Sequence, residues 1–244
     1  MGEREIRSVL VLGDSLSRGV VYDDQKKRYC FLKDDSFVNA VSRDVTCAVH
    51  NFSKFGTTVS YAEALLQPKL EATAADAVLI EFGGNDCDFD WNQVALSPLS
   101  PHQPKTRLEE FSAALERMVL AIQESGKIPL LMTLPPLNAP SYFNWFTGGD
   151  REKQANILKW LGDVGRIYWW HERYSSAIVR IGRRTGARII DVRGEFLAQE
   201  DFRIYLCSDG IHPNAKGHGI MARAVENFIR VHAAWLMATP AACI

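Results

Sequence analysis

Three residues near opposite ends of the chain carry the side chains that nucleophilic acyl transfer requires. Ser15 stands in Gly-Asp-Ser-Leu, directly after the apolar run that ends at Leu12, while Asp209 and His212 lie three residues apart in Ser-Asp-Gly-Ile-His-Pro. A serine hydroxyl becomes a strong nucleophile when a neutral imidazole accepts its proton. A carboxylate that accepts the other imidazole N–H fixes the tautomer. The pattern predicts Ser15 as nucleophile, His212 as general base and Asp209 as its support.

Acyl transfer also needs donors for the negative charge that develops on the carbonyl oxygen. The backbone N–H of Ser15 can supply one hydrogen bond, the backbone N–H of Gly56 a second, and the side-chain amide of Asn85 a third. Glycine suits position 56 because a side chain there would obstruct the approach of the oxygen. We therefore predict an oxyanion hole formed by these three residues.

Composition limits the partners that the chain can take. Its 244 residues carry 28 basic and 29 acidic side chains with no long run of either sign, which argues against binding nucleic acid or an anionic membrane. The five cysteines are scattered without a Cys-x-x-Cys pair, and neither a signal peptide nor a membrane span is evident. We expect one domain over residues 1–244, a cytoplasmic location and a small-molecule partner; the oligomeric state stays open.

Short apolar runs alternate with helical patterns along the chain. Strands are predicted at Val9–Leu12, Val45–Val49, Ala77–Phe82, Ile128–Thr133 and Arg188–Val192; helices at Val59–Glu71, Arg107–Glu124, Arg151–Arg184 and Ala215–Met237, the third interrupted near Gly162 or Gly165. This alternation indicates an α/β fold with a parallel sheet covered on both faces. Ligands bind beyond the carboxyl ends of such strands, so the candidate residues should converge on one edge of the sheet.

Two long segments without a regular pattern follow predicted strands, at residues 87–106 and 134–150. They should therefore hang over the same edge of the sheet, where long loops usually shape a binding site. Trp91 lies in the first segment, and Tyr142 and Trp145 lie in the second. Aromatic faces pack well against acyl chains and sugars, so these three residues are candidates for substrate binding, with burial in the core as the alternative.

Four sequence blocks together resemble the SGNH, or GDSL, superfamily of esterases and lipases. They are Gly13-Asp-Ser-Leu-Ser17, Asn51-Phe-Ser-Lys-Phe-Gly-Thr57, Gly83-Gly-Asn-Asp86 and Asp209-Gly-Ile-His-Pro213, in the order of the family. The resemblance implies a flavodoxin-like three-layer α/β/α sandwich with a single, mostly parallel, five-stranded sheet. It further implies the catalytic and oxyanion roles given above, with neither a metal nor an organic cofactor. One departure is Ser53, which replaces the first glycine of the second block.

Other interpretations of the same residues are less favoured. Ser17 is a second hydroxyl beside the first block, but it lies outside the position of the nucleophile. Asp14 and Asp86 fit turn positions better than an acid/base pair, because short carboxylates bond to nearby backbone. His218 and His212 lack a third ligand at a spacing that a metal ion needs.

The sequence thus predicts a serine esterase that acts through an acyl-enzyme, with short acyl groups such as O-acetyl esters of carbohydrates or small alcohols. The same catalytic residues also serve lysophospholipases and thioesterases of the superfamily, so these activities remain an alternative. A second alternative is a catalytically silent α/β module that binds a small molecule at this edge of the sheet.

Overall fold

The computed structural model describes residues 6–233 and residue 237. At its centre is a five-stranded parallel sheet with the strand order β4-β1-β5-β6-β7. The strands are β1 (Ser8–Gly13), β4 (Ala48–Asn51), β5 (Ala77–Glu81), β6 (Ile128–Met132) and β7 (Arg188–Ile190). This order is that of flavodoxin-like sheets, in which the chain changes direction beside the first strand. The predicted fold class is confirmed.

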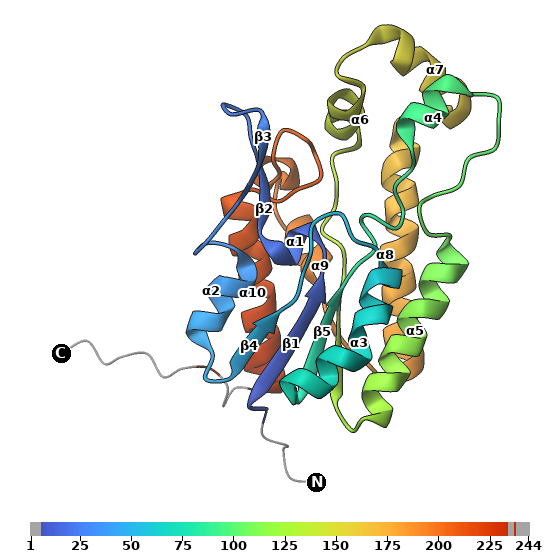
Figure 1. Ribbon diagram of the computed structural model, residues 1–244. Coiled ribbons are helices and arrows are strands. Elements are labelled where there is room, and N and C mark those ends of the chain that lie inside the picture. Colours follow the sequence, from blue (N-terminus) through green and yellow to red (C-terminus); the bar gives the residue numbers. More distant parts are fainter. Residues whose placement is uncertain (1–5, 234–236, 238–244) are drawn as a thin grey trace.

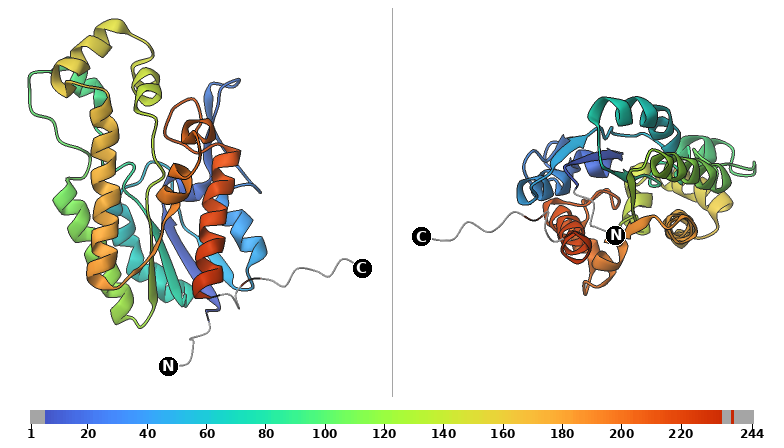
Figure 2. Two further views of the ribbon diagram at one scale, coloured as in Figure 1. Left: turned by 180° about the vertical axis from the view of Figure 1, so that it is seen from behind. Right: turned by 90° about the horizontal axis from the view of Figure 1, so that it is seen from below.

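Helices cover both faces of this sheet, as Figures 1 and 2 show. One face carries α3 (Val59–Thr73), α5 (Leu108–Glu124) and α8 (Gly165–Thr185), and the other carries α2 (Phe37–Asp44), α9 (Val192–Leu197) and α10 (Ala215–His232). Leu10 and Leu12 point into the first core, and Val11 points into the second. Because successive side chains of a strand face opposite sides, burial on both sides explains the continuous apolar runs. None of the helices in the described ranges has the length and apolar character for crossing a bilayer.

Further elements stand above the carboxyl ends of the strands (Figure 1). They are α1 (Ser15–Arg18), the hairpin of β2 (Val20–Asp23) and β3 (Arg28–Phe31), α4 (Trp91–Leu96), α6 (Ala139–Thr147), α7 (Arg151–Leu161) and the 3₁₀ turn η1 (Phe202–Tyr205). We call α4, α6, α7 and the first two turns of α8 the cap. The cap has its own apolar core, which includes Phe89, Ile157, Leu161 and Ile167.

Several boundaries differ from the sequence prediction. The two long segments are not wholly irregular: α4 and α6 form within them, because Asp90 and Asn138 cap their first turns. The last helix ends at His232, because Ala233 leaves the helical conformation with a φ of −159°, and Met237 forms an isolated extended bridge with Val45. The predicted strand at Val45 accordingly begins only at Ala48, where pairing with β1 starts.

The predicted interruption of the third helix is confirmed. The α7 helix ends at Leu161 and α8 begins at Gly165. Gly162 adopts a φ of 80°, a conformation that other residues enter only with strain, so the chain leaves the helix there.

Candidate active site

Ser15 lies at the first position of α1, where the chain leaves the carboxyl end of β1. Asp14 caps this short helix by accepting a hydrogen bond from the backbone N–H of Leu16 at 3.0 Å. At Gly13 a Cβ atom would lie 2.5 Å from the Oγ of Ser17, so only glycine permits the tight turn. The turn presents the Ser15 hydroxyl to a pocket above the sheet.

Ser15, His212 and Asp209 form one continuous chain of hydrogen bonds. The Oγ of Ser15 lies 3.0 Å from Nε2 of His212, and Nδ1 of His212 lies 2.6 Å from Oδ2 of Asp209. All three residues are buried, and Asp209 has no exposed surface. With Nδ1–H donating to the carboxylate, Nε2 carries the lone pair that can accept the serine proton. The geometry therefore allows Nε2 of His212 to accept the proton of the Ser15 hydroxyl.

The loop that carries His212 and Asp209 is held by its own backbone and by the cap. The other oxygen of Asp209 accepts hydrogen bonds from the N–H groups of Ile211 and His212, each at 3.1 Å. Gly210 has a φ of 77°, and its carbonyl accepts a hydrogen bond from the N–H of Asn138 at 2.8 Å. The start of α6 is thus attached directly to the loop that positions the imidazole.

The three predicted oxyanion residues border the same pocket. Ser15, Gly56 and Asn85 all line it, although they follow three different strands. Asn85 donates one amide hydrogen to Oδ2 of Asp14 at 2.9 Å, which orients the amide and leaves its second hydrogen available. Gly56 has a φ of 76°, so its backbone conformation itself favours glycine.

Ser17, the second hydroxyl, points away from His212 into a buried polar cluster. Its Oγ donates to Oε2 of Glu81 at 2.9 Å, and the same oxygen accepts from the backbone N–H groups of Ser17 and Asp14. Glu81 was missed by sequence reasoning, although a charged residue at the end of an otherwise apolar strand is a visible signal. Its role is to hold the turn that contains Ser15.

Three carboxyl groups lie buried behind the nucleophile, and all have raised pKa values. Burial is the main cause for Asp14 and for Glu81, and the nearby charge of Asp14 raises the pKa of Glu81 further. Burial raises the pKa of Asp86 to about 6, although the N–H of Val59 donates to its carboxylate at 3.1 Å. Asp14 thus bonds to the backbone of its own turn, as predicted, whereas Asp86 bonds to the first residue of α3, 27 positions earlier, and joins that helix to the segment after β5.

His218 is a core residue of α10. It has no exposed surface, its Nδ1 accepts from the N–H of Phe37 at 3.4 Å, and burial lowers its pKa to about 4. Within the described part of the chain, no group of three or more histidine, cysteine or acidic side chains is placed to hold a metal ion. His218 and His212 therefore do not form the start of a metal site.

The pocket in front of Ser15 has a volume of about 320 Å³. Trp91, Tyr142 and Trp145, the three predicted aromatic residues, all line it. Trp91 and Tyr142 also donate hydrogen bonds to the same oxygen of Asp88, at 2.9 and 2.8 Å, so α4 and α6 are fixed to each other. The pocket wall opposite the sheet is therefore built from the cap.

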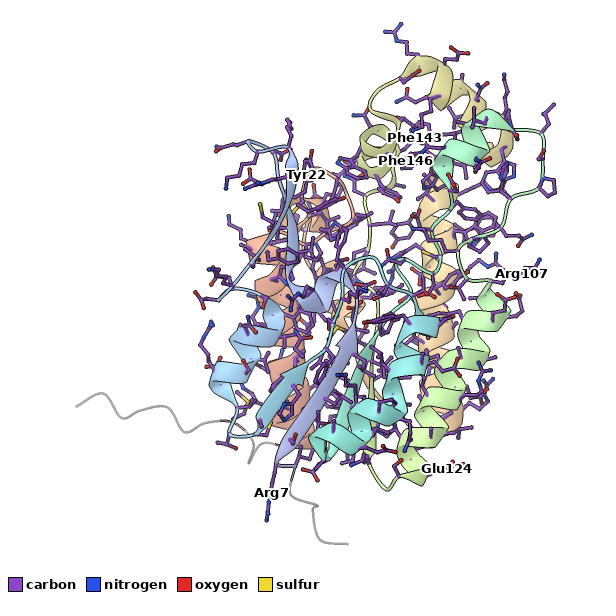
Figure 3. All side chains as sticks on the ribbon, viewed as in Figure 1. Arg7, Tyr22, Arg107, Glu124, Phe143 and Phe146 are labelled. Carbon is purple, nitrogen blue, oxygen red and sulfur yellow. The ribbon has the colours of Figure 1, made fainter. Side chains whose placement is uncertain are left out.

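Two further aromatic residues, which sequence reasoning missed, cover the imidazole. The rings of Tyr29 and Phe55 lie 5.1 and 6.2 Å from that of His212. Tyr29 also contacts Trp145 of α6 at 5.9 Å, so the β2–β3 hairpin meets the cap across the mouth of the pocket. Figure 3 shows this end of the molecule, with Tyr22 on the hairpin and Phe143 and Phe146 on α6.

Solved structures of known enzymes share this fold. A lipase/acylhydrolase from Enterococcus faecalis aligns over 97% of this chain and 100% of its own, with a TM-score of 0.68 and 17% identity. A catalytic mutant of Axe2, an acetylxylan esterase from Geobacillus stearothermophilus, aligns over 96% of this chain and 97% of its own, with a TM-score of 0.64 and 20% identity. At these identities the likeness concerns the fold.

Relatives by sequence come from Arabidopsis thaliana. The GDSL esterase/lipase CPRD49 is 25% identical over 165 residues, which are 67% of this chain and 57% of that protein. The GDSL esterase/lipase At2g38180 is 25% identical over 170 residues, 69% of this chain and 46% of that protein. The chain therefore matches about half the length of these relatives. The model of the GDSL-like Lipase/Acylhydrolase family matches residues 11–220, so this chain belongs to that family.

Proposed function

We propose that this chain hydrolyses carboxylic esters through an acyl-enzyme formed on Ser15. The observation that carries the proposal is the unbroken relay from Ser15 Oγ through His212 to Asp209, with contacts of 3.0 and 2.6 Å, at the wall of a pocket. A binding module has no physical need for an imidazole aligned between a hydroxyl and a buried carboxylate. That arrangement favours catalysis over the silent alternative.

In the proposed reaction the Ser15 oxygen attacks the ester carbonyl while Nε2 of His212 takes its proton. The oxyanion accepts hydrogen bonds from the N–H groups of Ser15 and Gly56 and from the free amide hydrogen of Asn85. The C–O bond to the alcohol then breaks, and the imidazolium returns the proton to the leaving oxygen. Water repeats the sequence on the acyl-enzyme and releases the acid, while Asp209 stabilises each imidazolium.

We further propose a substrate with a short acyl group, such as an acetyl ester of a carbohydrate or another small alcohol. The pocket volume of about 320 Å³ lies at the small end of the range for ligand sites. Tyr29, Phe55 and Trp145 line it, and the ring of Tyr29 contacts the other two rings. One structural relative is named as an acetylxylan esterase, which agrees with this substrate class.

Hydrolysis of p-nitrophenyl acetate tests the reaction class. Replacing Ser15 by alanine should lower kcat by at least ~10⁴-fold, since the nucleophile is removed. The matched control is Ser17→Ala, which removes a buried hydroxyl two residues away that contacts Glu81 and not His212. A fluorophosphonate should label Ser15 stoichiometrically. Labelling of Ser17, or equal loss in both variants, would contradict the assignment.

A series of acyl chain lengths tests the substrate class. We expect kcat/KM to be highest for acetate and to fall for octanoate, because the cap restricts the pocket. A maximum at octanoate or on acyl thioesters would instead identify the lysophospholipase or thioesterase alternative. A correctly folded protein that turns over no ester or thioester would identify the binding module.

A further inference from the structure

His171 is a buried histidine that lines the pocket and has no hydrogen-bond partner within residues 6–233. It lies in the second turn of α8 and is 6% exposed. Its Nδ1 is fully covered and has no partner among the described residues. No hydrogen bond to Nε2 is present there either, but this atom keeps some exposed surface. His212 and His218, the two other buried histidines, each have at least one bonded ring nitrogen.

The imidazole of His171 is neutral near pH 7. Burial is the main cause that lowers its pKa to about 3, and the charge of Arg193 acts in the same direction. Arg193 itself is paired with Glu172 and donates to the carbonyl of Leu134 at 3.0 Å, so it is already engaged. A neutral imidazole offers one N–H donor and one lone pair.

Burial of the two nitrogens indicates which one carries the hydrogen. In folded proteins an enclosed N–H without a partner is rarer than an enclosed acceptor without one. On this basis we assign the lone pair to the enclosed Nδ1 and the hydrogen to Nε2. His171 consequently presents a donor without an acceptor to the pocket.

The surroundings of this donor are apolar. The residues that line the pocket on α7 and on the first turns of α8 are Leu161, Ile167 and Trp170, and they join the apolar core of the cap. Leu134 and Leu137 contribute further apolar lining from the segment after β6. This part of the pocket, which we call the α8 arm, therefore combines a mostly apolar wall with the unpaired, uncharged donor of His171.

We propose that the α8 arm binds a part of the substrate that is apolar but carries one uncharged oxygen, an ether, hydroxyl or carbonyl, which accepts a hydrogen bond from Nε2 of His171. This inference rests on the proposed ester hydrolysis and assigns His171 as a specificity-determining residue. A cation is disfavoured beside His171, because the N–H of the imidazole would face it and the charge of Arg193 lies nearby. A pure hydrocarbon would leave the buried donor unpaired, which sites of this kind disfavour.

Paired esters that differ by one atom test the proposal. In the acyl series, p-nitrophenyl pentanoate is compared with p-nitrophenyl methoxypropanoate. In the alcohol series, butyl acetate is compared with methoxyethyl acetate. In each series, further esters place the ether oxygen at other positions along the chain. The expected result is a preference of roughly 10-fold in kcat/KM for the oxygen-containing ester at one position in one series. The series that responds identifies the half of the ester in the α8 arm.

Variants of His171 test whether its hydrogen bond causes the preference for the oxygen-containing ester. The preference should disappear in His171→Phe, which keeps the ring volume, and persist in His171→Gln, whose amide places a donor near the position of Nε2. For each variant we compare the ratio of kcat/KM for the two paired esters with the wild-type ratio. The intrinsic reactivity of the esters is the same for every variant, so it cancels in this comparison. His102→Phe, which alters a histidine outside the pocket lining, should retain the wild-type ratio. Equal ratios in wild type and His171→Phe would overturn the proposal.

Binding without turnover keeps this test independent of the proposed reaction. In isotopically labelled Ser15→Ala protein, methoxyethyl acetate or methyl methoxypropanoate should shift the Nε2 resonance of the imidazole assigned to His171. Butyl acetate and methyl pentanoate should leave it in place. If neither ether ester shifts this resonance, the proposed binding in the α8 arm is overturned. If the resonance shifts but the wild-type protein hydrolyses no ester, the binding proposal stands and the proposed ester hydrolysis is refuted.

Discussion

Replacing Asp209 by asparagine tests whether the relay works by fixing the tautomer of His212. Oδ1 of Asp209 accepts from two backbone N–H groups at 3.1 Å, whereas Oδ2 faces Nδ1 of His212 at 2.6 Å. An asparagine must keep its carbonyl oxygen on the two backbone donors, so its NH₂ group takes the place of Oδ2. It then donates to Nδ1, and the imidazole hydrogen moves to Nε2.

In that tautomer Nε2 donates to Ser15 and cannot accept its proton, although the turn stays intact. We therefore expect kcat for p-nitrophenyl acetate to fall by ~10⁴-fold, while the thermal midpoint changes little. Asp150→Asn is a matched control, because Asp150 accepts from the N–H groups of Glu152 and Lys153 in the same way but contacts no imidazole. Heteronuclear NMR of His212 reports the tautomer. An Asp209→Asn protein that keeps more than about a tenth of wild-type kcat would refute the reasoning.

Two further predictions concern the buried carboxyl groups. Asp86 has a pKa of about 6 in the folded protein against an ordinary value of 3.8, so the native state binds its proton more tightly. The free energy of unfolding should fall by up to about 3 kcal/mol as pH rises through this interval. Urea unfolding at a series of pH values should show this fall in the wild type and not in Asp86→Asn. Glu81→Gln should keep neutral-pH stability within about 1 kcal/mol, while Glu81→Leu, which leaves three donors unpaired, should lose roughly 3 kcal/mol in the same assay. Equal losses in both variants would contradict the assignment of these three hydrogen bonds to the Glu81 carboxyl group.

The parallel sheet explains why so much of the site could be predicted from sequence. Continuous apolar runs such as residues 77–80 indicated buried parallel strands, and the carboxyl ends of such strands meet at one edge. Ser15, Gly56, Asn85 and His212 could therefore be expected around one pocket, where the structure places them. That inference needed only the order of the strands and the position of each residue after its strand.

Residues that depend on packing between distant segments gave no comparable signal. Tyr29 lies on a four-residue strand of mixed polarity, and its contact with His212 exists only because the hairpin folds over the loop near the other end of the chain. His171 occupies the buried stripe of α8 between Ile167 and Tyr174, where its spacing is that of an ordinary core position. Only the three-dimensional structure shows that its Nδ1 has no hydrogen-bond partner among the described residues.

The contacts that shape the pocket also hold the loop that carries Asp209 and His212, so a change in the pocket wall can reach this loop. The N–H of Asn138, at the start of α6, donates to Gly210, between Asp209 and His212. At Gly210 a Cβ atom would lie 2.7 Å from the backbone N of Tyr142, and the hydroxyl of Tyr142 bonds to Asp88 beneath α4. A displacement of α6 by a badly fitting substrate would therefore be transmitted to the His212 loop. Because the 3.0 Å contact with Ser15 depends on that loop, selectivity for the substrate can be expressed in kcat as well as in KM.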